Sequence, residues 1–131
     1  MIYTGENCLY NAIKSIDLNS KIGVIGNCIN KTAKHAGFQV IQQFGGHGLT
    51  WDSPHAAPFV PNKSEVNEGI RFQPGMSIAI EPLLVPNNCS TQTKKDADGW
   101  TIYTEDVSTH HEHTIFIHPD RVEIMTHREV S

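Results

Sequence analysis

The sequence predicts an α+β fold in which two helices pack on a curved, mostly antiparallel sheet. Apolar residues recur at helical spacing as far as about residue 36, and from residue 38 they recur at a period of two. The apolar runs in this second part are short, and clusters rich in Gly, Pro, Asn and Asp separate them. Helices that precede a series of strands indicate an α+β domain with the helices on one face of the sheet.

Two helices are expected before residue 38. Thr4 is placed to cap the first, whose apolar face consists of Cys8, Leu9, Ala12, Ile13 and Ile16. Ser20 is placed to cap the second, whose apolar face consists of Ile22, Ile25, Ile29, Thr32, Ala33 and Ala36. Gly37 is a natural stop for this helix. The short link between the helices predicts an antiparallel pair.

The remaining residues predict strands joined by loops and turns. Strands are expected at residues 38–44, 76–82, 100–104, 110–118 and 121–126, with a tight turn at 119–120. Residues 44–62 are rich in Gly and Pro, so a long irregular segment is expected there. Residues 85–99 are expected to form a polar excursion between strands.

Composition indicates one ordinary globular domain, residues 1–131. Hydrophobic residues make up 38% of the chain and charged residues 18%, which suits a soluble protein with one core. A net charge of −4 without a basic run argues against nucleic acid or an anionic membrane as a partner. No apolar segment has membrane-spanning length and no secretory signal follows Met1, so a cytoplasmic location is expected.

The three cysteines, Cys8, Cys28 and Cys89, are odd in number and far apart in the sequence. Buried free thiols are expected for the first two.

The segment "STHHEHTIFIH", residues 108–118, contains half of the eight histidines. Strand alternation places His110 and Glu112 on one face, and His111 and His113 on the other. Three interpretations are open at this point: a metal chelate of His111 with His113, a chelate of His110 with Glu112, or exposed histidines in a polar strand.

Two other side chains are candidate ligands. Glu81 ends an alternating apolar strand and is followed at once by a proline, so it is either a solvated strand end or a rigidly held metal ligand. His47 has glycines on both sides, which allow a ligand to approach the backbone closely. The alternative for His47 is a polar residue in a glycine-rich turn.

Four motifs in order, "GGHG", "PGMSIAIEP", "DGWTIYT" and "HEHTIF", resemble the C-terminal half of a type I methionine aminopeptidase. The resemblance runs from the helices to about Met125 and implies half of the pita-bread metallopeptidase fold. It also implies roles for single residues. His47, Glu81 and Glu112 would be metal ligands, with Glu81 also moving a proton. His55 would contact the scissile peptide carbonyl, and Trp100 would lie near the pocket for the methionine side chain.

The resemblance implies removal of N-terminal methionine from peptides or nascent chains by metal-activated water. The metal would be Co, Mn, Fe or Zn. The family's other two ligands are aspartates on a hairpin N-terminal to the first helix, so one ion rather than two, and impaired activity, are expected for this chain. A homodimer or a complementing N-terminal half is the expected partner. The alternative is an inactive metal-binding or structural remnant, and His110 is a candidate substitute ligand beside Glu112.

Overall fold

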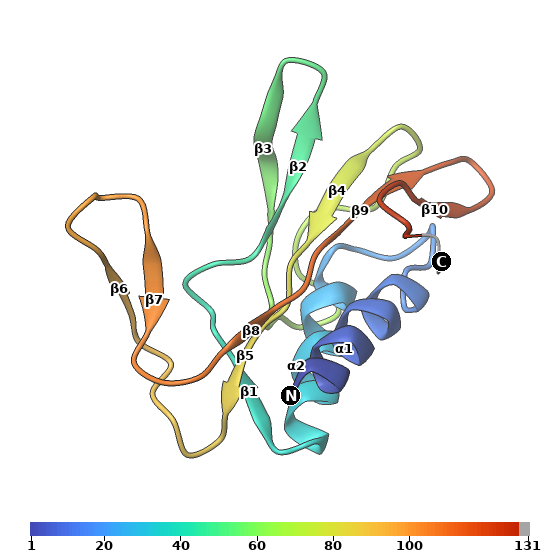
Figure 1. Ribbon diagram of the computed structural model, residues 1–131. Helices are drawn as coiled ribbons and strands as arrows, with labels where there is room; N and C mark the ends of the chain where they lie inside the picture. Colours follow the sequence, from blue (N-terminus) through green and yellow to red (C-terminus); the bar gives the residue numbers. More distant parts are fainter. Residues whose placement is uncertain (129–131) are drawn as a thin grey trace.

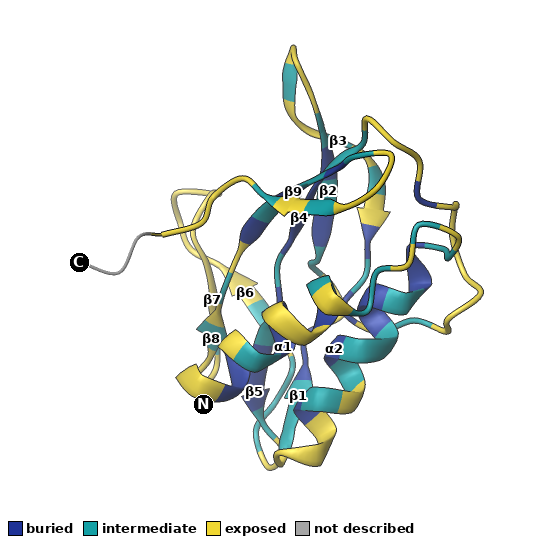
Figure 2. Ribbon diagram, turned by 90° about the vertical axis from the view of Figure 1, so that its right-hand side faces the viewer, coloured by how far each residue is buried: buried dark blue, intermediate teal, exposed yellow. Residues whose placement is uncertain are grey.

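The computed structural model describes residues 1–128, which begin with two helices, α1 (Ile2–Lys14) and α2 (Gly23–His35). The helices pack side by side and run antiparallel, as expected (Figure 1). Both are amphipathic, and their shared inner face is buried against the sheets (Figure 2). The outer face of the pair is solvent-exposed.

The predicted helix starts are wrong, whereas the predicted end of α2 is confirmed. Thr4 lies within α1 and is buried, because α1 begins three residues earlier, after Met1, without a side-chain cap. The Ser20 hydroxyl instead donates to the carbonyl oxygen of Asp17 in the link, and Ile22 is the residue before α2. Gly37 has φ +86°, the left-handed conformation that commonly ends a helix.

Ten strands follow α2 within the described residues. They are β1 (Phe38–Val40), β2 (Gly46–Thr50), β3 (Ser53–Val60), β4 (Ser77–Ile80), β5 (Leu83–Pro86), β6 (Thr93–Lys95), β7 (Ile102–Thr104), β8 (Thr109–His110), β9 (His113–Ile117) and β10 (Val122–Ile124). The main sheet has the order β10-β9-β4-β2-β3, a second sheet has the order β1-β5-β8, and β6 pairs with β7 alone. Every named pairing is antiparallel, which confirms the predicted α+β class.

The prediction of an irregular segment at residues 44–62 is wrong, because most of it forms the β2–β3 hairpin. The glycines that suggested a loop are required by close strand packing. A Cβ on Gly46 would lie 2.0 Å from the carbonyl oxygen of Ala79 in β4, and one on Gly48 would lie 2.1 Å from that of Ala57 in β3. The polar excursion at residues 85–99 is likewise partly ordered, since it contains β6.

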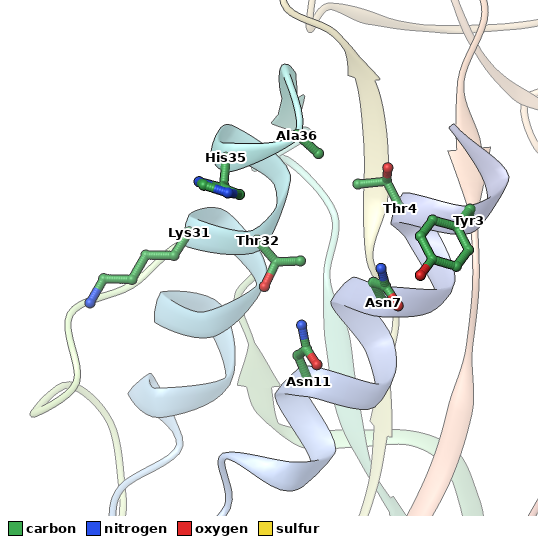
Figure 3. A pocket seen from close by; sticks show the side chains of 8 residues that line it. All are labelled: Tyr3, Thr4, Asn7, Asn11, Lys31, Thr32, His35 and Ala36. Carbon is green, nitrogen blue, oxygen red and sulfur yellow. The ribbon is translucent and has the colours of Figure 1, made fainter.

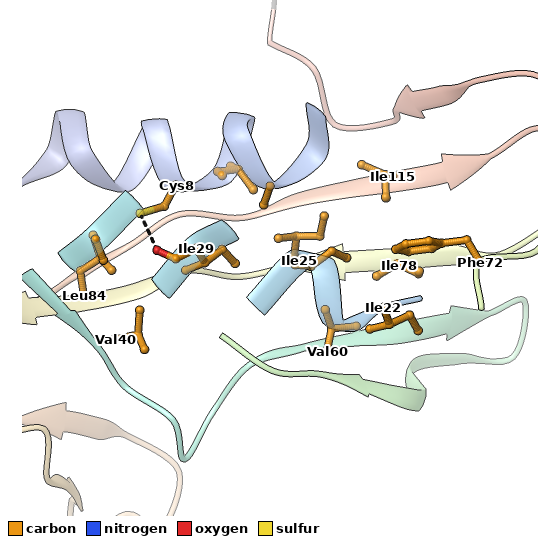
Figure 4. Packing of buried hydrophobic residues seen from close by; sticks show 14 of the residues in the cluster. Cys8, Ile22, Ile25, Ile29, Val40, Val60, Phe72, Ile78, Leu84 and Ile115 are labelled. Atoms are coloured by element: carbon orange, nitrogen blue, oxygen red, sulfur yellow. Dashed lines mark hydrogen bonds between the residues drawn. The ribbon is translucent and has the colours of Figure 1, made fainter. Parts of the chain in front are cut away.

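The core lies between the helices and the face of the sheets that packs against them (Figure 4). Alternate residues of β4 and β9 point into it, and Ile78, Ile80, Ile115 and Ile117 are fully buried. Each such side chain contributes about 1.5–3 kcal/mol by burial. The residues between them therefore point to the opposite face of the sheet, away from the helices.

Cys8 belongs to this core, and its thiol donates to the carbonyl oxygen of Ile29 at 3.6 Å (Figure 4). Burial, followed by the nearby Cys28, raises the pKa of Cys8 to about 12. Cys8 is the buried free thiol that was expected, whereas Cys28 is only partly buried. Among the residues that the structure describes, no helix is long and apolar enough to cross a membrane.

Candidate metal centre

Strand register places two carboxylates opposite each other where the two sheets meet. Ile80 pairs with His113 across β4 and β9, and Leu83 pairs with His110 across β5 and β8. The residues between these pairs must follow the same antiparallel register, so Glu81 lies opposite Glu112. Two like charges directly opposite each other destabilise a sheet. A cation between them would remove that repulsion.

His47 lies on the same face of the sheet as the two carboxylates. It pairs with Ala79 across β2 and β4, and Ala79 precedes Glu81 by two residues, which is one repeat of the strand. His47 is therefore the diagonal neighbour of Glu81. Its Nε2 atom lies 2.9 Å from Oε1 of Glu81, and the exposed fractions of these two side chains are 17% and 16%.

His47, Glu81 and Glu112 together form a potential cation site. One donor atom from each lies within 4.8 Å of the other two, and Glu112 is the most exposed of the three. One imidazole and two carboxylates are a donor set that suits transition-metal divalent cations. The structure thus brings together all three residues that the resemblance implied as ligands.

The orientation of the His47 ring also suits a ligand. Its Nδ1 atom lies 2.9 Å from the carbonyl oxygen of Gly48, and a carbonyl can only accept, so Nδ1 must carry the hydrogen. This hydrogen bond fixes the ring orientation and leaves Nε2 as the atom that faces Glu81. A backbone carbonyl that orients a ligating histidine in this way is common around metals.

Glu81 also contacts a second imidazole. His110 Nε2 lies 3.0 Å from its Oε2 atom. Partial burial opposes ionisation of Glu81, but the hydrogen bonds and charges of His110 and His47 outweigh it and lower the pKa of Glu81. The hydrogen bond to Glu81 in turn raises the pKa of His110, against the effect of its own partial burial. Glu81 is therefore held as a carboxylate.

Sequence reasoning missed Asn62, which is 1% exposed and supports this centre from a loop. Its side-chain amide donates to the backbone carbonyl oxygen of Glu81 at 2.9 Å and is also within 3.5 Å of the carbonyl oxygen of Phe44. A buried amide with two backbone acceptors fixes the strand end that carries Glu81. No local pattern identifies Asn62, because its partners are 18 and 19 residues away.

His113, the residue after Glu112, points to the opposite face of the sheet. It is buried, its Nε2 atom lies 3.1 Å from the Tyr10 hydroxyl on α1, and its Nδ1 atom lies 2.7 Å from the Thr126 hydroxyl. The predicted division into faces is therefore confirmed for His113, which points toward the helices as Ile115 does. His111 also points there, since its ring contacts Gly5 of α1. A chelate of His111 with His113 at this site is excluded, because both point away from Glu112.

The two other residues implied by the resemblance lie at different distances from this centre. The ring centroids of His55 and His47 are 4.5 Å apart, so His55, from β3, lies beside the candidate ligand. Trp100 lies at the end of the β6–β7 hairpin and is 87% exposed. This hairpin projects away from the helices (Figure 1).

A groove lies elsewhere, between α1 and α2 (Figure 3). It has a volume of about 590 Å³ and is lined by Tyr3, Thr4, Asn7, Asn11, Lys31, Thr32, His35 and Ala36. All of these residues belong to α1, α2 or the residue after α2, whereas the candidate ligands lie on the other face of the sheet. The groove is therefore separate from the metal centre.

Comparison with known proteins agrees with the motifs and the geometry. Residues 3–119 match metallopeptidase family M24. The chain belongs to this family. It is 37% identical over 128 residues to methionine aminopeptidase A of Synechocystis sp., a match that covers 96% of this chain and 49% of that protein. It is 40% identical over 116 residues to the methionine aminopeptidase of Aquifex aeolicus, covering 86% of this chain and 44% of that protein.

The fold of this M24 chain is also that of one half of a methionine aminopeptidase. The crystal structure of the Thermotoga maritima methionine aminopeptidase superposes with a TM-score of 0.88 at 32% identity, and the match covers 97% of this chain and 51% of that one. The expected pita-bread fold is therefore confirmed for the described residues. The chain spans about half the length of the curated relatives it matches, and it corresponds to their C-terminal half.

Proposed function

We propose that this chain supplies part of the active site of an aminopeptidase that removes N-terminal methionine from peptides or nascent chains. The observation that carries the proposal is the meeting of His47, Glu81 and Glu112 on one face of the sheet, with donor atoms within 4.8 Å of one another. Belonging to family M24 and similarity to methionine aminopeptidases support the same reaction class.

His47 Nε2 and carboxylate oxygens of Glu81 and Glu112 would hold a divalent cation, with Co, Mn, Fe or Zn as the candidates. The fit rests on the opposed carboxylates, which need a positive charge between them, and on the fixed Nδ1 hydrogen of His47. When bound, such a cation lowers the pKa of coordinated water and makes a nucleophile available near neutral pH.

Side chains of this chain would carry out proton transfer and substrate binding. Glu81, held as a carboxylate, would accept a proton from the attacking water at one of its oxygens and pass it to the leaving amine. His55, which lies beside His47, would donate a hydrogen bond to the peptide carbonyl. Trp100 would contact the methionine side chain from the β6–β7 hairpin.

We further propose that the 131-residue chain by itself releases methionine slowly and binds one metal ion rather than two. Only three of the five ligands that the family resemblance implies lie among them. The other two would be supplied by a complementing N-terminal half, and a second copy of this chain would occupy that place in its absence. A cytoplasmic location and a single domain spanning residues 1–131 are part of this proposal.

The test is release of methionine from a Met-Ala-Ser peptide in the presence of Co²⁺ or Mn²⁺, with the variant Glu112→Ala. We expect slow, metal-dependent release by the wild type and none by the variant. Glu123→Ala is the matched control, since Glu123 is a β-strand carboxylate that pairs with His118 outside the centre. Metal binding without any release would favour the alternative, an inactive metal-binding member of the family.

A further inference from the structure

Glu81 is held by a different imidazole at each of its two oxygens. Oε1 lies 2.9 Å from Nε2 of His47, and Oε2 lies 3.0 Å from Nε2 of His110. His110 is not one of the three residues whose donor atoms lie within 4.8 Å of one another. It is also not among the ligands that the family resemblance implies.

The contact between His110 and Glu81 is built into the sheets. His110 ends β8 and pairs with Leu83 of β5, two residues beyond Glu81 on the same face. Its side chain is 47% exposed, so its ring reaches Glu81 from the solvent side. The position of the His110 ring is therefore set by the pairing of β8 with β5. It does not result from a chance contact between two exposed side chains.

The arrangement determines how Glu81 can bind a cation. A carboxylate can use one oxygen or both, and a hydrogen bond to one oxygen reserves the other for the metal. We infer that His110 is a positioning residue, whose Nε2–H group holds Oε2 of Glu81 and thereby presents Oε1 to a cation shared with His47 and Glu112. The inference rests on the proposed metal centre and adds a residue to it.

A hydrogen-bonding role fits His110 better than direct ligation. The Nε2 atom of His110 is directed at Oε2 of Glu81. The three residues whose donor atoms lie close enough to share a cation are His47, Glu81 and Glu112, and His110 is not one of them. Groups that hydrogen-bond a metal ligand fix its orientation, and their loss typically weakens metal binding by about 10- to 100-fold. A residue that acts only through an N–H donor can also be replaced by another such donor.

The test compares Co²⁺ binding by calorimetry in the wild type, His110→Ala and His110→Gln. We expect His110→Ala to bind about 10- to 100-fold more weakly with unchanged stoichiometry, and His110→Gln, which keeps an N–H donor, to stay close to the wild type. His118→Ala is the matched control, because it removes another histidine–glutamate contact, of 2.7 Å, outside the centre. Equal affinity of His110→Ala and wild type would overturn the inference.

Two further results would also overturn it. If His110→Gln binds as weakly as His110→Ala, the imidazole itself is a ligand. If ¹⁵N NMR of the metal-free protein shows the His110 hydrogen on Nδ1 and not on Nε2, the ring does not donate to Glu81. Failure of the proposed function looks different: the wild type would bind Co²⁺, lose affinity in His110→Ala, and still release no methionine.

Discussion

At the scale of single residues, Gly46 shows how closely strands approach the backbone around His47. A Cβ at this position would lie 2.0 Å from the carbonyl oxygen of Ala79, a backbone atom that cannot rotate away. We expect Gly46→Ala to lower the free energy of unfolding by about 1–3 kcal/mol or more, measured by urea denaturation.

Gly99→Ala is the control for this substitution. Gly99 has φ +75° but nothing lies within 4 Å of a Cβ added there, so only conformational strain of about 1–2 kcal/mol is expected. A Gly46→Ala variant as stable as the wild type would show that β2 and β4 are further apart than described.

Cys8 gives a second residue-scale prediction. Burial raises the pKa of its thiol to about 12, and the thiolate is the reactive form. We expect iodoacetamide at pH 8 to leave Cys8 unmodified in the native protein and to modify it once urea unfolds the chain. Mass spectrometry of the digested protein measures this, and rapid native modification of Cys8 would contradict the described core.

Single residues also show what sequence reasoning can reach. His47, Glu81 and Glu112 were predictable because each lies in a short local motif. Asn62 and the contact between His110 and Glu81 were not, because both depend on contacts between residues 19 and 29 positions apart in the sequence. His110 could be named only as a neighbour of Glu112 on one face.

At the scale of elements, α1 is tied to the strand that follows Glu112 through Tyr10, His113 and Thr126. Burial, followed by the charges of His127 and Arg128, lowers the pKa of His113 below its ordinary value of 6.5. Below pH 6.5 the unfolded chain therefore binds more protons at this residue than the folded one, and stability falls as the pH drops toward the folded pKa.

We expect His113→Gln to flatten this dependence. The drop in melting temperature between pH 7 and pH 5, measured by calorimetry, should be smaller in the variant than in the wild type. The seven other histidines are common to both proteins, so the difference reports on His113. Parallel curves for the two proteins would show that His113 is not desolvated in the folded state.

The elements also explain the limits of the fold prediction. The helices and β4, β9 and β10 were predictable from apolar periodicity, because one face of each is buried. The β2–β3 hairpin was missed, since its glycines serve close packing between strands and leave no apolar alternation. The helix starts were missed because neither helix uses a side-chain cap.

At the scale of the whole molecule, α1 and α2 cover one face of the sheets, and the candidate ligands His47, Glu81 and Glu112 lie on the other. Large apolar side chains are exposed on the hairpins, including Phe59 and Trp51. The outer strands of the main sheet, β10 and β3, have unpaired edges among the described residues. Exposed sheet edges and apolar side chains favour association with another chain.

We therefore expect the 131-residue chain to form a homodimer at micromolar concentration, as measured by sedimentation equilibrium. Addition of a separately produced N-terminal half of a related methionine aminopeptidase should compete with this dimer if it occupies the same face. A monomer that persists at these concentrations would contradict the expectation.

We propose that strand register creates a cation site by placing Glu81 opposite Glu112 and beside His47. The most direct measurement is calorimetric titration of the metal-free protein with Co²⁺, for the wild type, Glu112→Ala and the control Glu123→Ala. We expect one bound ion per chain in the wild type and the control, and lost or greatly weakened binding in Glu112→Ala. Absence of binding in the wild type, or equal binding in Glu112→Ala, would contradict it.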